Sequence, residues 1–311
     1  MGYRHLFGPV PSRRLGVSLG IDLVPHKVCT LNCVYCECGG TTLLTLERAE
    51  YVPFAEVSNE IETYLRENPA PDYITFSGSG EPVLNSSIGE VIALIKDISH
   101  IPVAVLTNGT LFTDASVRRE VLGADLVMPS LDAASPGAFQ RINRPHSGLD
   151  VKDHIRGLAD LRREISGEMW LEIFLLPGYN DCRENLESLR DAIGRIEPHR
   201  IQLNTLDRPG AVEGLRPAPG EWLESIAEDW GFPGTEVIAP AASRREKTSF
   251  RKDLEETIYE TIGRRPCTLK DLCGILGLHA NEVNKYLAVL EEAGRIETVS
   301  MDRGVFHRVV R

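Results

Sequence analysis

Short apolar runs rich in β-branched residues alternate with amphipathic stretches over the first 240 residues of the chain. The runs have the length of β-strands, and the stretches between them have the apolar spacing of helices. Six predicted strands span 17–23, 73–77, 103–107, 126–130, 170–176 and 200–204, and four predicted helices span 55–66, 88–98, 151–165 and 185–196. Repeated strand–helix units predict an α/β protein with a parallel sheet that stays open or curls into a partial or complete barrel.

Polar, glycine-rich segments follow these strands directly. They are residues 78–82, 108–109, 132, 177–181 and 205. In parallel α/β proteins the ligand site lies beyond the carboxyl ends of the strands, so we expect these loops to converge and form a small-molecule site. Glycine and asparagine also serve as ordinary turn residues, and for any single loop that structural role stays an equal alternative.

The composition indicates a globular protein that has no membrane segment. The 311 residues suffice for two domains, and hydrophobic residues make up 42% of them. No run reaches the ~20 apolar residues that span a bilayer, and the first twenty residues lack the apolar centre of a signal peptide. With 34 Lys and Arg against 45 Asp and Glu, the net charge of −11 gives no basic excess for nucleic acid. We therefore expect a cytoplasmic protein.

A change in composition after residue 240 predicts a second domain. Residues 241–251 are small and basic, which is typical of a linker. Beyond them, three helical patterns are followed by two β-type runs, 296–300 and 305–310, on either side of a turn. Three helices and a hairpin predict a winged helix-turn-helix. The expected organisation is therefore a core domain at 1–240, a linker at 241–251 and a winged helix-turn-helix at 252–311.

The charge of this second domain bears on what it binds. Residues 251–311 hold ten Lys and Arg and ten Asp and Glu, whereas a DNA-binding domain normally has a positive face. Its third predicted helix offers Asn281, Asn284 and Lys285 as outward polar residues. Contact with a protein, a peptide or the core domain is at least as well supported as contact with nucleic acid, and the basic linker leaves RNA open.

Four of the seven cysteines lie between residues 29 and 38, directly after the first predicted strand. Cys29, Cys33 and Cys36 have the spacing Cys-x3-Cys-x2-Cys, and three thiolates on one loop can hold a metal centre with one coordination position left open. Cys38 could occupy that position and close a zinc or cluster site. The chain has no second pair of cysteines or histidines at metal-ligand spacing, which favours an open iron–sulfur cluster over zinc.

This cysteine loop resembles the cluster motif of radical S-adenosylmethionine (radical SAM) enzymes, with Tyr35 in the aromatic position before the last cysteine. The resemblance extends to four further segments, which follow successive strands and which contact the cofactor in that family. They are Ser79-Gly80-Glu81-Pro82, which is similar to the family's Gly-Gly-Glu motif, Thr107-Asn108-Gly109, Ser130-Leu131-Asp132-Ala133 and Leu175-Leu176-Pro177-Gly178. The resemblance covers residues 16–208.

This resemblance implies a fold, two cofactors and a first chemical step. The fold is a partial (β/α)6 barrel, to which the winged helix-turn-helix is joined, and the cofactors are a [4Fe-4S] cluster on Cys29, Cys33 and Cys36 and S-adenosylmethionine. A low-potential donor, flavodoxin or ferredoxin, would reduce the cluster, and cleavage of S-adenosylmethionine would give a 5′-deoxyadenosyl radical that abstracts hydrogen from a substrate. The expected contacts to S-adenosylmethionine are Tyr35, Ser79, Gly80, Glu81, Asn108, Ser130, Asp132 and Leu176.

Within that superfamily, the chain resembles the wyosine-type iron–sulfur oxidoreductases. Residues 7–16, 141–145 and 203–209 carry this resemblance. The tricyclic tRNA-base synthase of that group holds a second cluster through cysteines upstream of the first, whereas this chain has no cysteine before Cys29. Its ring-forming reaction is therefore not assigned to this chain, and the substrate stays open between a tRNA base, a peptide and a small metabolite.

Two other functions compete with the enzyme. One is a regulator that senses redox state through an iron–sulfur cluster and acts through the winged helix, but such a regulator has no use for the cofactor-type loops. The other is a binding protein stabilised by zinc, with Cys38 as the fourth ligand. Several further residues have both a site role and a plain structural role open to them: Arg13, Arg14, Arg144, Arg208, Asp181, Asp207 and Cys38, while Cys273 is expected in the core.

Overall fold

The computed structural model describes residues 3–12, 14–207, 210–238, 252–264, 266–276, 278–301 and 304–310. The predicted linker at 241–251 and two of the candidate arginines, Arg13 and Arg208, lie outside these residues. We call residues 3–238 the core unit and residues 252–310 the C-terminal unit. Among the described residues, no helix has both the length and the apolar character needed to cross a bilayer.

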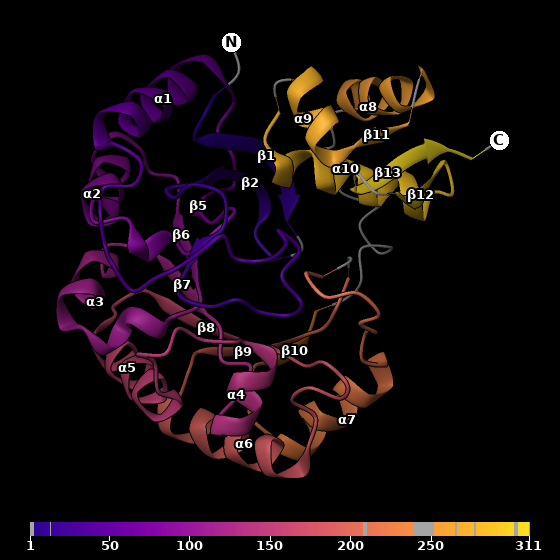
Figure 1. Cartoon of the computed structure of the whole chain (residues 1–311). Coiled ribbons are helices and arrows are strands. Elements are labelled where there is room, and N and C mark those ends of the chain that lie inside the picture. Colours follow the sequence, from indigo (N-terminus) through magenta and orange to yellow (C-terminus); the bar gives the residue numbers. More distant parts are fainter. Residues whose placement is uncertain are drawn as a thin grey trace.

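An eight-stranded sheet forms the centre of the core unit, and its strands are β1 (Leu6–Ser12), β2 (Gly16–Ile21), β5 (Tyr73–Phe76), β6 (Val103–Thr107), β7 (Leu126–Pro129), β8 (Glu168–Phe174), β9 (Arg200–Asn204) and β10 (Thr235–Val237). The strands lie side by side in chain order. β1 is antiparallel to β2, and every later strand is parallel to the one before it. Because each strand adds at the same edge, the twisted sheet curves into the open barrel that Figure 1 shows. This confirms the expected α/β fold.

The helices of the core unit are α1 (Phe54–Glu67), α2 (Ile88–Ile98), α3 (Ala115–Val121), α4 (Pro136–Ile142), α5 (Val151–Glu164), α6 (Arg183–Ile196) and α7 (Gly220–Trp230), with the short 3-10 helices η1 (Pro82–Leu84) and η2 (Thr110–Thr113). Most of them flank the outer side of the curved sheet (Figure 1). In α1, Val57, Ile61 and Tyr64 are buried at helical spacing, which gives the helix one apolar stripe to pack on the sheet. A second small sheet pairs β3 (Val28–Cys29) with β4 (Leu43–Leu44).

Sequence periodicity finds most strands of the large sheet and four of the helices of the core unit, and misses the others. The six predicted strands correspond to β2 and to β5 through β9, and the four predicted helices to α1, α2, α5 and α6. The periodicity does not predict β1, β10, α3, α4 or α7. β1 contains Pro9 and Pro11, β10 has three residues, and α3 and α4 have seven each, which is too short for a helical period to show.

Alternate residues of the central strands face opposite sides of the sheet. In β6, Val103 and Val105 belong to the apolar core between the sheet and the helices, whereas Ala104 packs with Leu126 and Met128 inside the barrel. Full burial of a valine, leucine or methionine side chain stabilises a fold by about 1.5–3 kcal/mol. The inner cluster comes largely from the early part of the strands, so the polar loops lie beyond it at the carboxyl ends.

The C-terminal unit has its own core. Its elements are α8 (Lys252–Arg264), β11 (Cys267–Thr268), α9 (Leu269–Leu276), α10 (Ala280–Glu292), β12 (Ile296–Met301) and β13 (Gly304–Val309), and its strand order is β11-β13-β12. Ile258, Leu272, Val283 and Leu290 are buried together in this core, and Cys273 packs against it. The order of three helices and a hairpin is the expected one, and the assignment as a winged helix-turn-helix stays a prediction.

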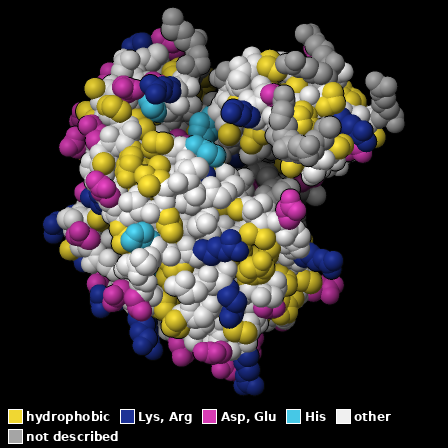
Figure 2. Space-filling view, viewed as in Figure 1, with side chains coloured by type: hydrophobic (Ala, Val, Ile, Leu, Met, Phe, Trp, Pro, Cys, Tyr) yellow, Lys and Arg dark blue, Asp and Glu magenta, His cyan; other side chains and the backbone are white. Residues whose placement is uncertain are grey.

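The C-terminal unit lies beside β1 (Figure 1). Histidine side chains gather on the surface where the two units meet, as Figure 2 shows. A cavity of about 460 Å³ at this junction is lined by residues of both units, among them His5, His26 and His279. The C-terminal unit is therefore packed against the core unit rather than held away from it.

Candidate functional site

Most of the predicted site residues meet at one cavity of about 280 Å³, at the carboxyl ends of β5, β6 and β7. Nine of the eleven residues line it: Cys29, Cys33, Tyr35, Cys36, Ser79, Gly80, Glu81, Asn108 and Ser130. The other two, Asp132 and Leu176, are not among its lining residues. The loops that follow β5, β6 and β7 therefore converge, and the cysteines lie among them, whereas residues 132, 177–181 and 205 are not in the cavity lining.

The cysteine loop, residues 29–38, is fixed in place by its backbone. Cys29 ends β3, which pairs with β4. Further along, Val34 N donates a hydrogen bond to Ile142 O at 2.9 Å, and Asn32 N donates to Asn143 O at 2.9 Å. The segment that ends α4, more than a hundred residues away in the sequence, thus sets the position of the loop.

An N–H donor approaches each of the three sulfur atoms that line the cavity. The pairs are Lys27 Nζ with Cys36 Sγ at 2.9 Å, Asn108 Nδ2 with Cys29 Sγ at 3.5 Å, and Asn143 Nδ2 with Cys33 Sγ at 3.4 Å. Donors of this kind stabilise the negative charge of a thiolate and orient it. Each of the three sulfur atoms therefore has a donor beside it that would stabilise its thiolate form.

The thiols differ in how readily they lose a proton. Burial raises the pKa of Cys29 to about 11 and raises the pKa of Cys33 well above its usual value. For Cys36, a hydrogen bond with Cys38 and the nearby Lys27 ammonium lower the pKa to about 5. Metal ligation requires thiolates, so a bound metal centre has to offset the burial of the first two sulfurs.

Cys38 is placed differently from the other three cysteines of the loop. Its side chain is not part of the cavity lining, and its sulfur lies 3.7 Å from Gly78 O and 3.5 Å from Asn281 Oδ1 of the C-terminal unit. In the part of the chain that the structure describes, no three His, Cys, Asp or Glu side chains form a group that could hold a metal ion. The Cys38 thiol also hydrogen-bonds with Cys36, so it lies near the proposed ligands although it does not line the cavity. The zinc site closed by Cys38 stays a prediction.

Glu81 places a buried carboxylate in the cavity wall. It caps η1, and its oxygens accept hydrogen bonds from Thr107 Oγ1 at 2.6 Å, Asn108 N at 2.7 Å and Val83 N at 3.2 Å. The residue is 2% exposed, and this burial raises the pKa of Glu81 to about 7. A cationic group that entered the cavity would pair with this carboxylate and favour its charged form.

The Ser79 loop, residues 77–81, depends on two close approaches of its backbone. A Cβ atom on Gly78 would lie 2.3 Å from Asp22 Cγ, and one on Gly80 would lie 2.2 Å from a backbone carbonyl oxygen, so only glycine fits at either position. Asp22 holds the loop by accepting hydrogen bonds from Ser79 N at 3.0 Å and from Ser79 Oγ at 2.6 Å. These contacts fix the loop at the cavity wall.

Asp132 lies behind the cysteine loop and ties several elements together. Tyr35 Oη donates to Asp132 Oδ2 at 2.5 Å, and Asn143 Nδ2 donates to the same oxygen at 2.6 Å. Phe174 N of β8 donates to Asp132 Oδ1 at 3.0 Å, and the Tyr35 ring stacks on Phe174 with centroids 3.8 Å apart. Burial raises the pKa of Asp132 to about 6. Asp132 is thus placed to hold residues of the site, and Leu176 lies fully buried in the apolar cluster beside it.

Sequence reasoning missed several residues that shape the site. Asp22 and Asn143 stand 57 and 110 positions from their partners Ser79 and Cys33, so no local pattern connects them. Lys27 is the exception, because it stands two residues before Cys29. A cation next to a cysteine motif is a signal that could have identified it.

Arg14 faces the cavity rather than solvent. Its side chain is 14% exposed, and its guanidinium pairs with Glu172 of β8 and lies 3.4 Å from Gln202 Oε1 of β9. Asn204 Nδ2 donates to Glu172 Oε1 at 3.1 Å. Arg14 and Glu172 both line the cavity, so part of its wall is a paired arginine and glutamate.

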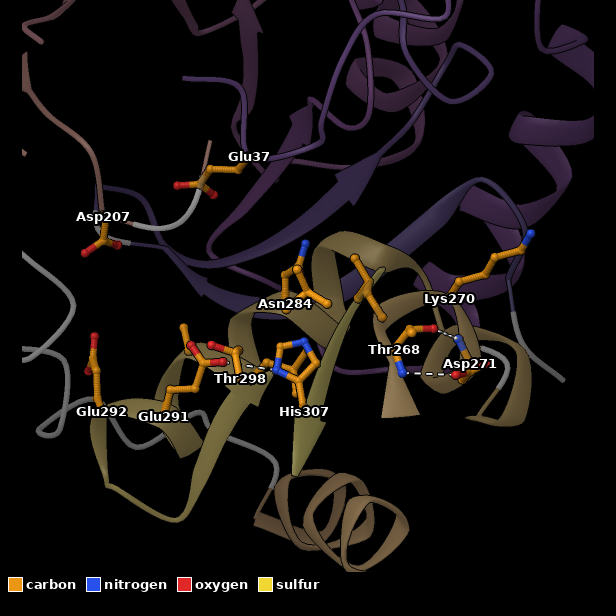
Figure 3. A pocket seen from close by; sticks show the side chains of 14 residues that line it. Glu37, Asp207, Thr268, Lys270, Asp271, Asn284, Glu291, Glu292, Thr298 and His307 are labelled. Carbon is orange, nitrogen blue, oxygen red and sulfur yellow. Dashed lines mark hydrogen bonds and ion pairs between the residues drawn. The ribbon is translucent and has the colours of Figure 1, made fainter. Parts of the chain in front are cut away.

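The remaining candidates lie away from this cavity. Arg144 is exposed, and Asp181 lines a separate surface cavity. Asp207 lines a groove of about 750 Å³ between the two units, together with Glu37 of the cysteine loop and with Glu291 of α10 (Figure 3). In the described lining of this groove carboxylates outnumber cations, a charge that does not favour nucleic acid.

Comparison with known proteins shows a family and two relatives of this chain. Residues 23–190 match the family model of the radical SAM superfamily, a stretch that includes the cysteine loop and the Ser79 loop. A UPF0026 protein of Methanocaldococcus jannaschii is 33% identical over 97% of this chain and 94% of its own length. A protein of Brachyspira hyodysenteriae named GTPase Obg is 36% identical over 94% of this chain, and the match spans 43% of that longer relative.

A solved structure shares the fold. A radical SAM methyltransferase from Sphaerobacter thermophilus matches with a TM-score of 0.52 at 21% identity, over 71% of this chain and 65% of that protein. At this level of identity the likeness concerns the arrangement of strands and helices alone. It agrees with the open barrel described above.

Proposed function

The chain belongs to the radical SAM superfamily, and we propose that Cys29, Cys33 and Cys36 hold the [4Fe-4S] cluster that the enzymes of this superfamily use together with S-adenosylmethionine. Bound together, the two cofactors would supply a reductive cleavage that takes one electron from an external donor and yields methionine and a 5′-deoxyadenosyl radical able to abstract hydrogen from a substrate. Three protein ligands leave one iron of such a cluster open to a further ligand.

One observation carries this proposal: three free cysteines line the same cavity as the Ser79 loop. Each of their sulfur atoms has an N–H donor beside it, which is the support that thiolate ligands of a cluster need. Soft thiolates select iron–sulfur clusters, zinc or copper(I) over magnesium and calcium. The donor set therefore fits an iron–sulfur cluster.

Glu81 is the residue to which we assign the amino group of S-adenosylmethionine. Its carboxylate is buried in the cavity wall, and a bound ammonium group would offset the cost of that burial. Ser79, Gly80 and Ser130 line the same cavity and supply backbone and hydroxyl groups for the rest of the cofactor. Asn108 lines it as well and joins the site to Cys29.

Asp132 and Leu176 take part in this proposal by holding other groups. Asp132 acts through Tyr35 and Asn143, both of which stand beside the cysteines. Leu176 packs in the apolar cluster to which Tyr35 also belongs. We therefore propose that both residues support the cysteine loop, whereas their contact with S-adenosylmethionine stays a prediction.

The reductant and the substrate complete the reaction. Radical SAM enzymes require an electron donor, and we propose flavodoxin or ferredoxin for this chain. Arg14 and Glu172 line the cavity beside the cysteines and would meet polar groups of the substrate, be it a tRNA base, a peptide or a small metabolite. A redox-sensing regulator is the alternative function. It is less well supported, because a regulator would not need the loops of the cavity that resemble S-adenosylmethionine-binding segments.

Anaerobic reconstitution of the full chain with iron and sulfide, followed by dithionite and S-adenosylmethionine, tests the proposal. We expect the electron paramagnetic resonance signal of a reduced [4Fe-4S] cluster, a change in that signal when S-adenosylmethionine is added, and formation of 5′-deoxyadenosine. Cys29→Ala should abolish all three. Cys182→Ala removes an exposed cysteine outside the cavity and is the matched control, which should retain all three.

Cys38→Ala distinguishes a cluster held by three cysteines from a metal site in which Cys38 is the fourth ligand. It should keep the cluster, because the Cys38 side chain does not line the cavity. Loss of the metal centre in Cys38→Ala as complete as in Cys29→Ala would contradict the three-ligand site. A reconstituted wild-type cluster whose signal ignores S-adenosylmethionine would contradict the enzyme and favour the regulator.

A further inference from the structure

The first turn of α10 is built into the core unit. Glu282 is 5% exposed and accepts a hydrogen bond from Gly8 N of β1 at 3.2 Å. His279, the residue before α10, stacks its ring on Phe7 of β1, with centroids 4.6 Å apart and an angle of 18° between the planes. The C-terminal unit thus meets the core unit through the beginning of this helix.

The imidazole of His279 reaches further into the core unit. Its Nδ1 accepts a hydrogen bond from Asn281 N at 3.2 Å, which caps α10. Nδ1 is therefore the unprotonated nitrogen, and Nε2 carries the hydrogen. Nε2 lies 3.1 Å from Asp22 Oδ2, to which it donates, and Asp22 is 6% exposed.

The same oxygen of Asp22 holds the Ser79 loop. Asp22 Oδ2 accepts hydrogen bonds from Ser79 N and Ser79 Oγ, and Gly78 packs against this carboxylate so closely that no side chain would fit. One carboxylate oxygen thus joins His279 of the C-terminal unit to a loop of the cavity wall. His279 is thus linked to Ser79 through a single residue, Asp22, which hydrogen-bonds with both.

We propose that His279 is a positioning residue for the cofactor: through Asp22 it holds the Ser79 loop in the conformation that binds S-adenosylmethionine, so that the C-terminal unit completes the site. The inference rests on the proposed function, which assigns S-adenosylmethionine to this loop. His279 does not line the cysteine cavity, so it acts on the loop through Asp22.

The burial of Asp22 explains why one donor matters. A buried carboxylate is stabilised by its hydrogen-bond donors, so loss of the His279 donor weakens that stabilisation and leaves only the two Ser79 donors on Asp22 Oδ2. Asp22 and Ser79 also line the junction cavity, together with His279. Without the imidazole, water in that cavity would compete with Ser79 for Asp22 and would loosen the loop.

This contact also bears on what α10 can bind. In a winged helix-turn-helix, the third helix is the element that enters a nucleic-acid groove. In this chain the beginning of that helix is taken up by Gly8, Phe7 and Asp22 of the core unit. The first turn of α10, which would contact bases in a DNA-binding winged helix-turn-helix, instead contacts the core unit next to the Ser79 loop.

The test compares His279→Ala and His279→Gln with His307→Ala in the full chain. Glutamine keeps an N–H donor at the end of its side chain, whereas alanine removes the donor. His307 is a buried histidine of the same unit, and its Nδ1 lies 3.0 Å from Glu291 Oε1. His307→Ala therefore removes a comparable contact within the C-terminal unit and controls for a general loss of stability.

Two measurements are made on each variant. The first is amide hydrogen exchange of residues 77–81 in the protein without cluster or cofactor, and the second is the affinity of the reconstituted protein for S-adenosylmethionine by equilibrium dialysis. Loss of one charge-assisted hydrogen bond should speed exchange of the Ser79 amide in His279→Ala and weaken affinity by about tenfold each. His279→Gln should stay within about threefold of wild type, and His307→Ala should change neither.

The outcomes separate this inference from the proposed function. If reconstituted wild type binds no S-adenosylmethionine, the proposed function fails, while the exchange measurement still tests the link to the loop. Unchanged exchange in His279→Ala overturns the inference, and so does faster exchange with unchanged affinity. Equal losses in His279→Ala and His307→Ala overturn it as well, because the effect would then come from the stability of the whole unit.

Discussion

Two buried carboxylates follow strands of the same sheet, and they differ in what they face. Glu81 follows β5 and Asp132 follows β7, each accepts three hydrogen bonds, and burial raises the pKa of Glu81 to about 7 and of Asp132 to about 6. Glu81 lines the cysteine cavity, whereas Asp132 lies behind the cysteine loop. A strand-end position and a family-like motif do not by themselves decide whether a side chain meets a ligand.

The donors of the two carboxylates explain the difference. Glu81 takes its hydrogen bonds from Thr107, Asn108 and Val83, which belong to the sheet edge and to its own turn, and it stays in the cavity wall. Asp132 takes two of its bonds from Tyr35 and Asn143, whose side chains also stand beside the cysteines. We therefore assign ligand binding to the first carboxylate and support of the cysteine loop to the second.

Glu81→Gln should have the largest effect on the cofactor. Glutamine keeps the shape of the side chain but removes the charge that pairs with an ammonium group in a buried site. Loss of one partner of a buried charged pair typically costs 2–5 kcal/mol, so we expect affinity for S-adenosylmethionine to fall by about 100-fold. Equilibrium dialysis of the reconstituted protein measures it, with iron content and the spectrum of the cluster as the check that Cys29, Cys33 and Cys36 are still loaded.

An affinity close to wild type in Glu81→Gln would break the distinction between the two carboxylates. Asp132→Asn gives the matched comparison, because it also neutralises a buried carboxylate at a strand end. Its effect on affinity should be much smaller than that of Glu81→Gln. Equal effects on affinity would mean that Asp132 contacts the cofactor as directly as Glu81 does.

Asp132→Asn should instead lower stability. The amide of the new asparagine cannot accept from all three of the present donors, so Asn143 or Tyr35 loses its partner in a buried place. An unsatisfied buried group costs about 1–3 kcal/mol, and we expect the free energy of unfolding of the protein without cluster to fall by about 2 kcal/mol. Chemical denaturation measures this, and the exposed Asp191→Asn should stay within about 0.5 kcal/mol of wild type.

The sequence could predict the sheet and the ligands but not the supporting contacts. Six strands can be predicted because they are short apolar runs bounded by turn residues. β1 cannot be predicted in this way, because Pro9 and Pro11 interrupt its strand-like pattern. Cys29, Cys33 and Cys36 are visible because their spacing on one loop carries the chemistry by itself. Asp132 was also visible at its strand end, but the motif does not tell in which direction its carboxylate points.

The contacts that hold the site come from distant parts of the chain. Asp22 meets Ser79 across 57 positions, Asn143 meets Cys33 across 110, and His279 meets Asp22 across 257. Local periodicity and motif spacing contain no information at such separations. The packing of the elements determines these pairs, so they appear only when the fold is known.

The pH dependence of cofactor binding should distinguish the two carboxylates further. With a pKa of about 7, against an ordinary value of 4.5, Glu81 holds a proton in the folded protein over a range in which the unfolded chain has lost it. The unfolding free energy contributed by Glu81 therefore falls as pH rises from about 4.5 to about 7. Pairing with an ammonium group needs the charged form, so affinity for S-adenosylmethionine should rise by about tenfold between pH 6 and pH 8.

Glu81→Gln is also the control for this pH dependence. Any titration of S-adenosylmethionine itself is common to both proteins, so the ratio of the two affinities isolates Glu81. That ratio should rise with pH through about 7. If the ratio of the wild-type affinity to the Glu81→Gln affinity stays constant from pH 6 to pH 8, Glu81 is already charged across this range. Deprotonation of Glu81 would then not contribute to the pH dependence of binding.

Tyr35→Phe should have the smallest effect and tests how Asp132 acts. The substitution removes one hydrogen bond to Asp132, whereas the stacking of the ring on Phe174 stays. A single hydrogen bond is worth about 1 kcal/mol net, so the free energy of unfolding should fall by about that amount and affinity for S-adenosylmethionine should change by less than about threefold. A loss of affinity as large as in Glu81→Gln would place the Tyr35 hydroxyl at the cofactor, and the support that Asp132 gives to Tyr35 would then be part of ligand binding itself.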